Sequence, residues 1–151
     1  MLPRTYDNQV CSVARALEAI GDRWTMLVIR DAFRGVSRFE DFQQRLGIAR
    51  NVLADRLNRL VEDGILVKHA YQERPERFEY RLTEKGLDLF PILMSLMKWG
   101  DRHAPDEAGP PLVVLHRGCG GEIDARLRCE RCGESTTALN AEARQPAPSA
   151  G

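Results

Sequence analysis

The chain has 151 residues, with 22 basic and 22 acidic side chains, and 43% of its residues are hydrophobic. This apolar fraction can build a folded core, so the composition excludes a wholly disordered chain. No apolar run approaches the roughly 20 residues that span a membrane, and the first residues lack the apolar segment of a signal peptide. We therefore expect a cytoplasmic protein without a membrane partner, whose four cysteines are thiols or metal ligands.

The neutral total charge is the sum of two parts with opposite signs. Residues 1–103 contain 17 basic and 15 acidic side chains, whereas the remainder contains 5 and 7. The segment APDEAGPP between these parts has the proline and glycine content of a linker. We expect a main domain at 1–103, a linker at 104–111, a cysteine-containing segment at 112–139 and a disordered tail at 140–151.

Apolar residues at helical spacing predict two short helices near the start of the chain. The first carries Val13, Leu17 and Ile20 on one face and ends at Gly21. Asp22 can cap the second helix. The buried stripe of this second helix is formed by Trp24, Leu27, Val28 and Ala32.

The next two predicted helices are separated only by a short turn. Ser37 and Glu40 form an S-x-x-E capping box, which predicts a helix that ends at Gly47. Its inner face is formed by Phe39, Phe42 and Leu46. Two residues after Gly47 another helix begins, followed by Gly64, with Leu53, Leu57, Leu60 and Val61 on one face. Two short helices joined by a glycine-containing turn are typical of a helix-turn-helix.

After Gly64 the apolar spacing changes from helical to alternating. Residues 65–71 and 77–82 alternate apolar and polar side chains, and the segment QERPE between them supplies a turn. The pattern predicts a β-hairpin with a charged tip. A helix-turn-helix followed by a hairpin indicates a mainly helical α+β fold, the winged helix-turn-helix.

A last helix is predicted from a cap at Thr83 to about His103. Its apolar residues occupy more than one face, so we expect it to pack against more than its own domain. Pro91 is expected to kink it.

The outward face of the fourth helix carries the side chains that can read DNA. Arginine reads guanine and asparagine reads adenine through paired hydrogen bonds, so Arg50, Asn51 and Asn58 are the predicted base contacts. Phosphate contacts are predicted for Arg38, Arg56, Arg59, Arg74 and Arg77. Residues 30–59 contain seven arginines and four acidic residues, which gives a modest local basic surface.

Three segments carry a family resemblance: CSVARALEAIGDRW (11–24), LVIRDAFRGVSRFEDFQQRLGIARNVLADRLNRLVEDGIL (27–66) and FEYRLTEKGLDLFPIL (78–93). They resemble the HxlR-type winged-helix transcriptional regulators, relatives of the MarR group. The resemblance implies a homodimer joined through its N-terminal and last helices on a palindromic operator, with the recognition helix at 49–63 and the wing at 67–82. Ala49 replaces the serine that usually precedes this helix, which weakens the cap and removes a phosphate contact.

Cys11 falls at the N-terminal cysteine of this family, which some members use to sense electrophiles or oxidants through disulfide formation. A sensor thiol needs exposure and a lowered pKa, and Arg15 could supply positive charge. The alternative is a buried structural cysteine at the start of a helix.

The second cysteine group consists of His116, Cys119, Cys129 and Cys132. Each pair has two residues between its members, a spacing that places two ligands on one metal, and the set would complete a tetrahedral zinc site. The segment resembles a small zinc ribbon. A segment with so few apolar side chains can hardly fold without a bound metal ion. The alternative is a degenerate ribbon whose thiols stay reduced and empty.

The sequence contains none of the motifs G-x-S-x-G, Walker A, G-x-G-x-x-G or H-E-x-x-H, so we do not expect an enzyme. The expected partners are an operator in double-stranded DNA, a second copy of the chain and a small-molecule or oxidant effector. Two alternatives stay open: a winged-helix module for protein–protein contact, and a redox or zinc switch without direct DNA readout.

Overall fold

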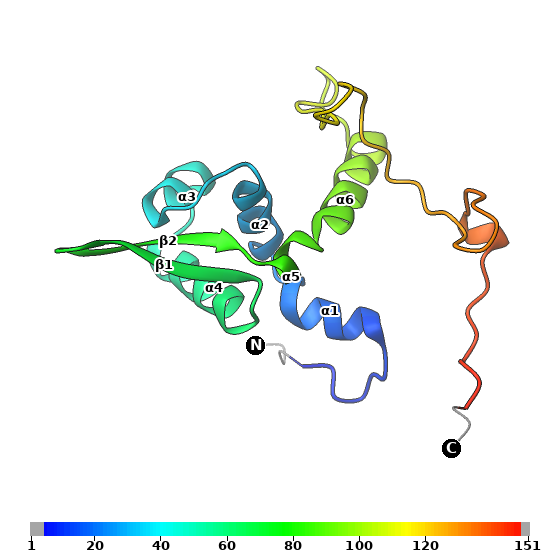
Figure 1. The fold of residues 1–151 in the computed structure, drawn as a ribbon, viewed down its shortest axis with the longest axis horizontal. Coiled ribbons are helices and arrows are strands. Elements are labelled where there is room, and N and C mark those ends of the chain that lie inside the picture. Colours follow the sequence, from blue (N-terminus) through cyan, green and yellow to red (C-terminus); the bar gives the residue numbers. More distant parts are fainter. Residues whose placement is uncertain (1–4, 149–151) are drawn as a thin grey trace. The chain divides into compact units, whose positions relative to one another are not determined.

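The first four helices of the computed structural model, which describes residues 5–148, are short and lie between Ser12 and Glu62 (Figure 1). They are α1 (Ser12–Ile20), α2 (Thr25–Phe33), α3 (Phe39–Leu46) and α4 (Arg50–Glu62). Asp22 Oδ1 accepts hydrogen bonds from the backbone N–H groups of Trp24 (2.9 Å) and Thr25 (3.1 Å), which confirms the predicted cap of α2. Gly47 ends α3 at φ 62°, a conformation that glycine adopts without steric cost.

The predicted capping box at Ser37 and Glu40 is wrong. Arg38 occupies the N-cap position of α3, and its side chain makes no cap hydrogen bond. The Ser37 carbonyl instead accepts a 2.7 Å hydrogen bond from the backbone N–H of Tyr80, and Arg38 forms an isolated antiparallel bridge with Glu79. Pairing with a strand that is distant in sequence therefore replaces the local cap.

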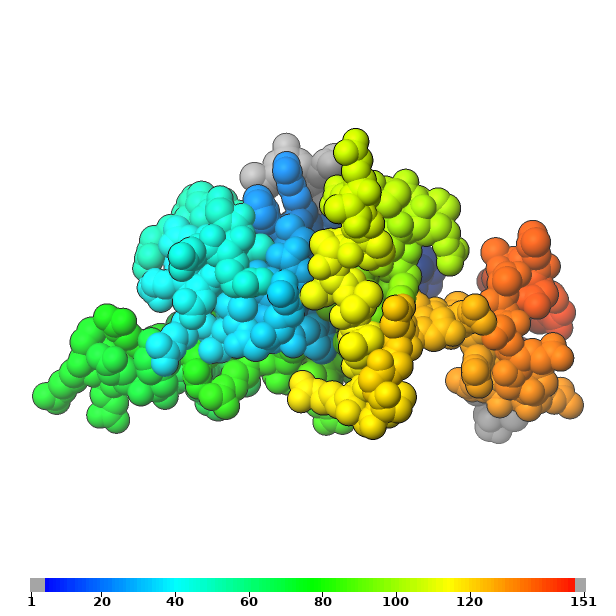
Figure 2. Space-filling view, turned by 90° about the horizontal axis from the view of Figure 1, so that it is seen from above, coloured from blue at the N-terminus to red at the C-terminus, as the bar shows by residue number. Residues whose placement is uncertain are grey.

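The wing is an antiparallel hairpin of β1 (Leu66–Glu73) and β2 (Glu76–Leu82). Its strands are longer than predicted, because the last pair, Glu73 with Glu76, leaves only Arg74 and Pro75 at the tip. Both faces of the tip are exposed to solvent, so the alternation of apolar and polar residues stops before the strands do. The wing projects beyond the helices of the residue 1–93 unit in two perpendicular views (Figures 1 and 2).

The core of this unit lies between α2, α3, α4 and the base of the wing. The predicted leucine face of α4 is confirmed, because Leu53, Leu57 and Leu60 are all buried. The core is completed by Val28, Ile29, Phe42, Ile48, Ile65, Leu66 and Tyr80. Asp31 is fully buried beside this core, and its carboxylate pairs with Arg30 Nε at 3.0 Å and Arg45 Nε at 3.4 Å.

The single last helix predicted from Thr83 to His103 is wrong. Two helices are present, α5 (Glu84–Leu87) and α6 (Phe90–His103), and the predicted kink at Pro91 is absent because Pro91 lies in the first turn of α6. The backbone N–H groups of a first turn have no intrahelical partner, so proline is tolerated there. Thr83 does cap α5, accepting a 3.1 Å hydrogen bond from the backbone N–H of Gly86.

A second compact unit begins at Met94, ten residues before the predicted linker. Beyond α6 it contains two isolated β-bridges and a short 3₁₀ helix (Ala138–Asn140). Residues 104–148 include no buried side chain. Residues 141–148 form no helix or strand, 149–151 lie outside the described residues, and disorder of the tail stays a prediction. Over residues 5–148, no helix is long and apolar enough to cross a membrane.

Candidate nucleic-acid interface

The outward face of α4 presents the three predicted base-reading side chains to solvent. Arg50, Asn51 and Asn58 are all exposed, and Ala49 precedes them as the N-cap residue without a side-chain cap. The Arg50 side chain is 68% exposed. Its guanidinium lies 4.6 Å from the centre of the Phe39 ring and 3.9 Å from Glu40 Oε1, so α3 positions this arginine without burying it.

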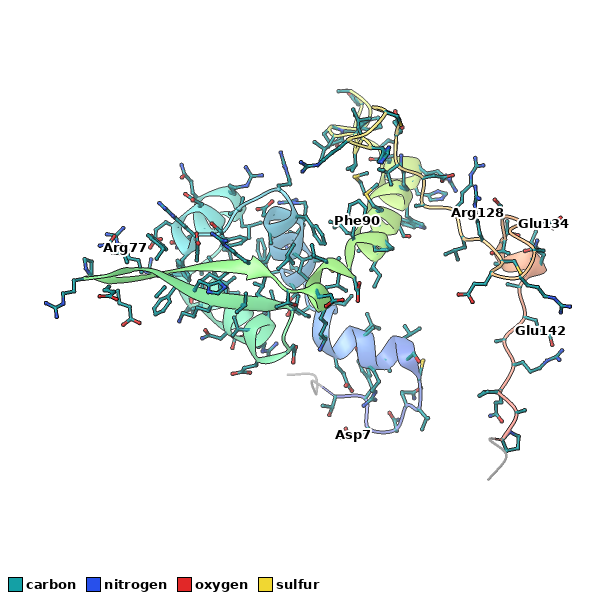
Figure 3. All side chains as sticks on the ribbon, in the orientation of Figure 1. Asp7, Arg77, Phe90, Arg128, Glu134 and Glu142 are labelled. Atoms are coloured by element: carbon teal, nitrogen blue, oxygen red, sulfur yellow. The ribbon has the colours of Figure 1, made fainter. Side chains whose placement is uncertain are left out.

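The wing supplies a second exposed basic element. Arg74 and Arg77 are exposed near its tip, and Figure 3 shows the position of Arg77 there. Arg38 is exposed at the start of α3, with its guanidinium 4.4 Å from the centre of the Tyr71 ring on β1. Lys68 on β1 is also exposed, 4.1 Å from the Phe78 ring. Lys68 was not among the predicted phosphate contacts, although it is a basic residue within the predicted wing, residues 67–82.

Arg56 and Arg59 are held in an ionic network inside the residue 1–93 unit. Arg56 Nε lies 2.9 Å from Asp22 Oδ1, and Arg59 Nε lies 3.4 Å from Asp55 Oδ2. The side chains of Arg56 and Arg59 are only 20% and 27% exposed. The structure therefore brings both predicted phosphate contacts to the start of α2, and their binding to phosphate stays a prediction.

Asp22 is the centre of this network. Its partial burial opposes ionisation, but hydrogen bonds from the Thr25 hydroxyl and the Trp24 backbone N–H, with the charge of Arg56, hold the pKa of Asp22 below its ordinary value. The carboxylate is therefore charged at neutral pH and serves both as the cap of α2 and as the partner of α4.

Cys11 is exposed at the N-cap position of α1. The backbone N–H groups of Ala14 and Val13 at the start of α1 lower the pKa of its thiol, although the side chain makes no cap hydrogen bond, and the charge of Arg15 contributes least. Arg15 is engaged elsewhere: it pairs with Glu18 at 3.1 Å and donates to the Tyr6 carbonyl at 2.6 Å. The buried structural alternative for Cys11 therefore does not fit its exposure within this chain.

The predicted apolar face of α1 is not buried within its own unit. Val13 is 65% exposed and Leu17 is 45% exposed, and Val10 just before the helix is fully exposed. Ala14 is the one buried residue of α1. Within this chain, the large apolar side chains at and just before the start of α1 are therefore exposed to solvent.

The four predicted metal ligands lie in two separate turns. His116 Nδ1 is 3.4 Å from Cys119 Sγ in the first turn. In the second turn, backbone hydrogen bonds from Cys132 and Arg131 and the Cys132 side chain lower the pKa of Cys129. Among residues 5–148, no three His, Cys, Asp or Glu side chains lie close enough to hold one metal ion. The structure thus shows two ligand pairs rather than the single four-ligand group of a zinc ribbon.

A family model described as HxlR-like helix-turn-helix matches residues 19–108, which include the wing and both helices of the helix-turn-helix. The chain belongs to the HxlR family. An HTH-type transcriptional regulator of Mycobacterium tuberculosis is 50% identical to it over 129 residues, which cover 85% of this chain and 82% of the relative. This HxlR protein is therefore an HTH-type transcriptional regulator that binds DNA, not an enzyme.

Solved structures support the same assignment. The crystal structure of PA1607, a candidate transcription factor, is 37% identical with a TM-score of 0.83, covering 93% of this chain and 99% of that one. The redox regulator HypR in its oxidised form is 31% identical with a TM-score of 0.58, covering 64% of this chain and all of HypR. The HxlR fold of this chain is therefore shared with a regulator that responds to oxidation.

Proposed function

We propose that this HxlR regulator binds a palindromic operator as a homodimer and reads its sequence through residues 49–63 in the major groove. The observation that carries the proposal is the division of α4 into two faces. Leu53, Leu57 and Leu60 are buried in the core, whereas Arg50, Asn51 and Asn58 are exposed. A helix that is fixed on one side and presents guanidinium and amide groups on the other has the chemistry of a recognition helix.

The wing, residues 67–82, would contact the DNA backbone and minor groove beside the recognition helix. The supporting observation is its basic side chains Arg74 and Arg77, which are exposed close to the tip. Arginine and lysine bind phosphate without reading sequence, so the wing would add affinity and fix orientation.

Dimerisation is supported by the exposed apolar residues of α1, since a single chain leaves Val10, Val13 and Leu17 in water. Residues Leu87, Ile92, Leu96 and Trp99, which lie in α5 and α6, are also exposed apolar side chains. Two dimer-related recognition helices would read half-sites separated by about one helical turn, roughly 10–10.5 base pairs, and this symmetry accounts for a palindromic operator.

Selection of bound sites from a random duplex pool by the full chain tests this function. We expect an inverted repeat, bound by the wild type with an affinity that falls as salt rises. Recovery of no preferred sequence, together with salt-insensitive absence of binding, would instead favour the protein–protein interaction module.

A second proposal is that Cys11 makes the regulator thiol-responsive. Its exposure and its position at the start of α1, where backbone N–H groups lower its pKa, favour the thiolate, which is the form that oxidants attack. Peroxide treatment should change the affinity of the wild type for its selected site, and a reductant should restore it. Cys11→Ser should bind the same site with equal affinity before and after treatment. Equal sensitivity of Cys11→Ser would remove Cys11 from the response.

A further inference from the structure

The two turns that hold the cysteine pairs of the second unit have the same backbone construction. In the first, His116 N donates to Gly121 O and Gly120 N donates to His116 O, each at 2.8 Å. In the second, Cys129 N donates to Glu134 O and Gly133 N donates to Cys129 O, again at 2.8 Å. An antiparallel bridge flanks each turn, Leu115 with Glu122 and Arg128 with Ser135. The chain thus builds one two-ligand turn twice.

Glycines make this construction possible in the first turn. Gly120 has φ 76°, and Gly133 is its counterpart in the second turn at φ 78°. A Cβ atom at Gly118 would lie 2.8 Å from His116 Cε1, so the imidazole folds back over a position that only glycine leaves open. Gly118 thus leaves room for the His116 ring beside Cys119.

The spacing of the first ligand pair matches the edge of a zinc tetrahedron. His116 Nδ1 and Cys119 Sγ are 3.4 Å apart. Zinc bonds of about 2.0–2.1 Å to nitrogen and 2.3 Å to sulfur, at a tetrahedral angle, would separate these two atoms by about 3.6 Å. The backbone N–H of Gly121 also points at Cys119 Sγ, at 3.4 Å, where it can stabilise a thiolate.

Apolar packing does not hold the two turns in place. Between residues 104 and 148 every side chain is exposed or half-buried, and Leu115 and Leu127 beside the turns are 48% and 72% exposed. A segment of this size without a core requires another constraint to fold. A metal ion that joins the two turns would supply that constraint.

From this geometry we propose that the second unit binds one Zn²⁺ per chain through His116, Cys119, Cys129 and Cys132, which brings its two turns together. Nine residues separate Cys119 from Cys129, and only residues 124–126 lie between the hydrogen-bonded ends of the turns. This short connection gives the second pair a high effective concentration at the first, so both pairs come from the same chain.

The site would be structural. Four protein ligands fill the tetrahedron and leave no position for water or substrate. Cys119, Cys129 and Cys132 bind as thiolates and His116 as neutral imidazole, so the three thiol protons pass to the buffer when zinc binds. Zinc with three thiolates has one net negative charge, and no oxidation is involved. None of the four ligands belongs to the helix-turn-helix, so zinc content and DNA binding are measured independently.

The full chain, purified reduced, tests the site by its zinc content and by Co²⁺ substitution. Wild type and the control Cys11→Ser should each retain one zinc per chain against a competing chelator. Cys119→Ser and Cys129→Ser, one from each turn, should both lose it. The Co²⁺ form of the wild type should show the intense thiolate charge-transfer absorption of a tetrahedral site, and amide hydrogen exchange over residues 112–137 should slow when Zn²⁺ is added.

Three outcomes would overturn the proposal. A reduced wild-type chain that retains no zinc has no such site. Retention by Cys129→Ser at the wild-type level would show that the first turn alone binds the ion. Recovery of zinc binding when Cys119→Ser and Cys129→Ser chains are mixed would place the ion between two chains rather than within one.

Discussion

The arginines of α4 differ in their surroundings, although all three lie on the same helix. Arg50 is open to solvent, whereas Arg56 and Arg59 are drawn back to Asp22 and Asp55. An arginine whose charge is already paired inside the protein must break that pair before it binds phosphate. Specificity is therefore expected from Arg50 rather than from Arg56 and Arg59.

Replacement of Arg50 by alanine should reduce discrimination between the selected operator and a site mutated at one base pair by about 1–3 kcal/mol, because a paired hydrogen bond to guanine is lost. Arg74→Ala and Arg77→Ala should instead weaken binding to all duplexes. They should also reduce the slope with which the logarithm of the binding constant falls as the logarithm of the salt concentration rises. Fluorescence anisotropy at several salt concentrations measures both effects. Arg144→Ala, which removes an exposed positive charge from the second unit, is the matched control. Equal loss on specific and random DNA for Arg50→Ala would contradict its role in base reading.

Asp22→Asn isolates the charge of the network, because asparagine can still cap α2. The lowered pKa of Asp22 means that its ionised form stabilises the fold above its unfolded pKa of about 3.9, and that this contribution disappears as the pH falls through the folded pKa. The variant should unfold more easily at pH 7, by about 0.5–1 kcal/mol. Urea titrations at pH 7 and pH 3 should show a difference that shrinks at the lower pH. A difference that is unchanged at pH 3 would assign the effect to shape rather than charge.

At the scale of elements, sequence patterns correctly predicted the features that depend only on residues close together in the chain. The leucine face of α4 and the glycine after α3 follow from helical spacing and backbone preference, and both are present. The capping box failed because the carbonyl of Ser37 is used by Tyr80, which only the folded wing brings near. The sequence signal for the break between α5 and α6 was Pro91, which was expected to kink one helix but lies in the first turn of a second one. The pairing of Arg56 with Asp22 was also missed, since spacing along α4 does not reveal a partner that lies just before α2.

The apolar face of α1 leads to a prediction about assembly. Val13→Glu places a charge in the exposed row that also contains Val10 and Leu17, so a dimer formed through α1 should dissociate. Ser12→Glu adds the same charge at an exposed neighbour outside this row and should stay dimeric. Sedimentation velocity measures the mass of each. Val13→Glu with the wild-type mass and an unaltered helical circular dichroism spectrum would exclude α1 from the interface.

For the whole molecule, the modest basic surface limits how tightly one recognition region can hold DNA. Residues 30–59 have three more arginines than acidic residues, and five of the arginines are already within ion-pair distance of a carboxylate, namely Arg30, Arg45, Arg50, Arg56 and Arg59. Two half-sites held together should bind roughly 10²–10⁴ times more tightly than one, through effective concentration alone. Titration of a full inverted repeat and of a single half-site measures this ratio. A half-site bound as tightly as the full repeat would contradict a dimeric reader.

The base of the wing contacts the start of α5 through Thr83 and Gly86. The Thr83 hydroxyl donates to the Gly64 carbonyl at 2.5 Å, and a Cβ atom at Gly86 would lie only 2.3 Å from the Ile65 carbonyl oxygen. The strand that enters the wing and the helix that leaves it are thus fastened at the same point. A displacement of α5 would therefore shift the base of the wing, and with it Arg74 and Arg77 at the tip.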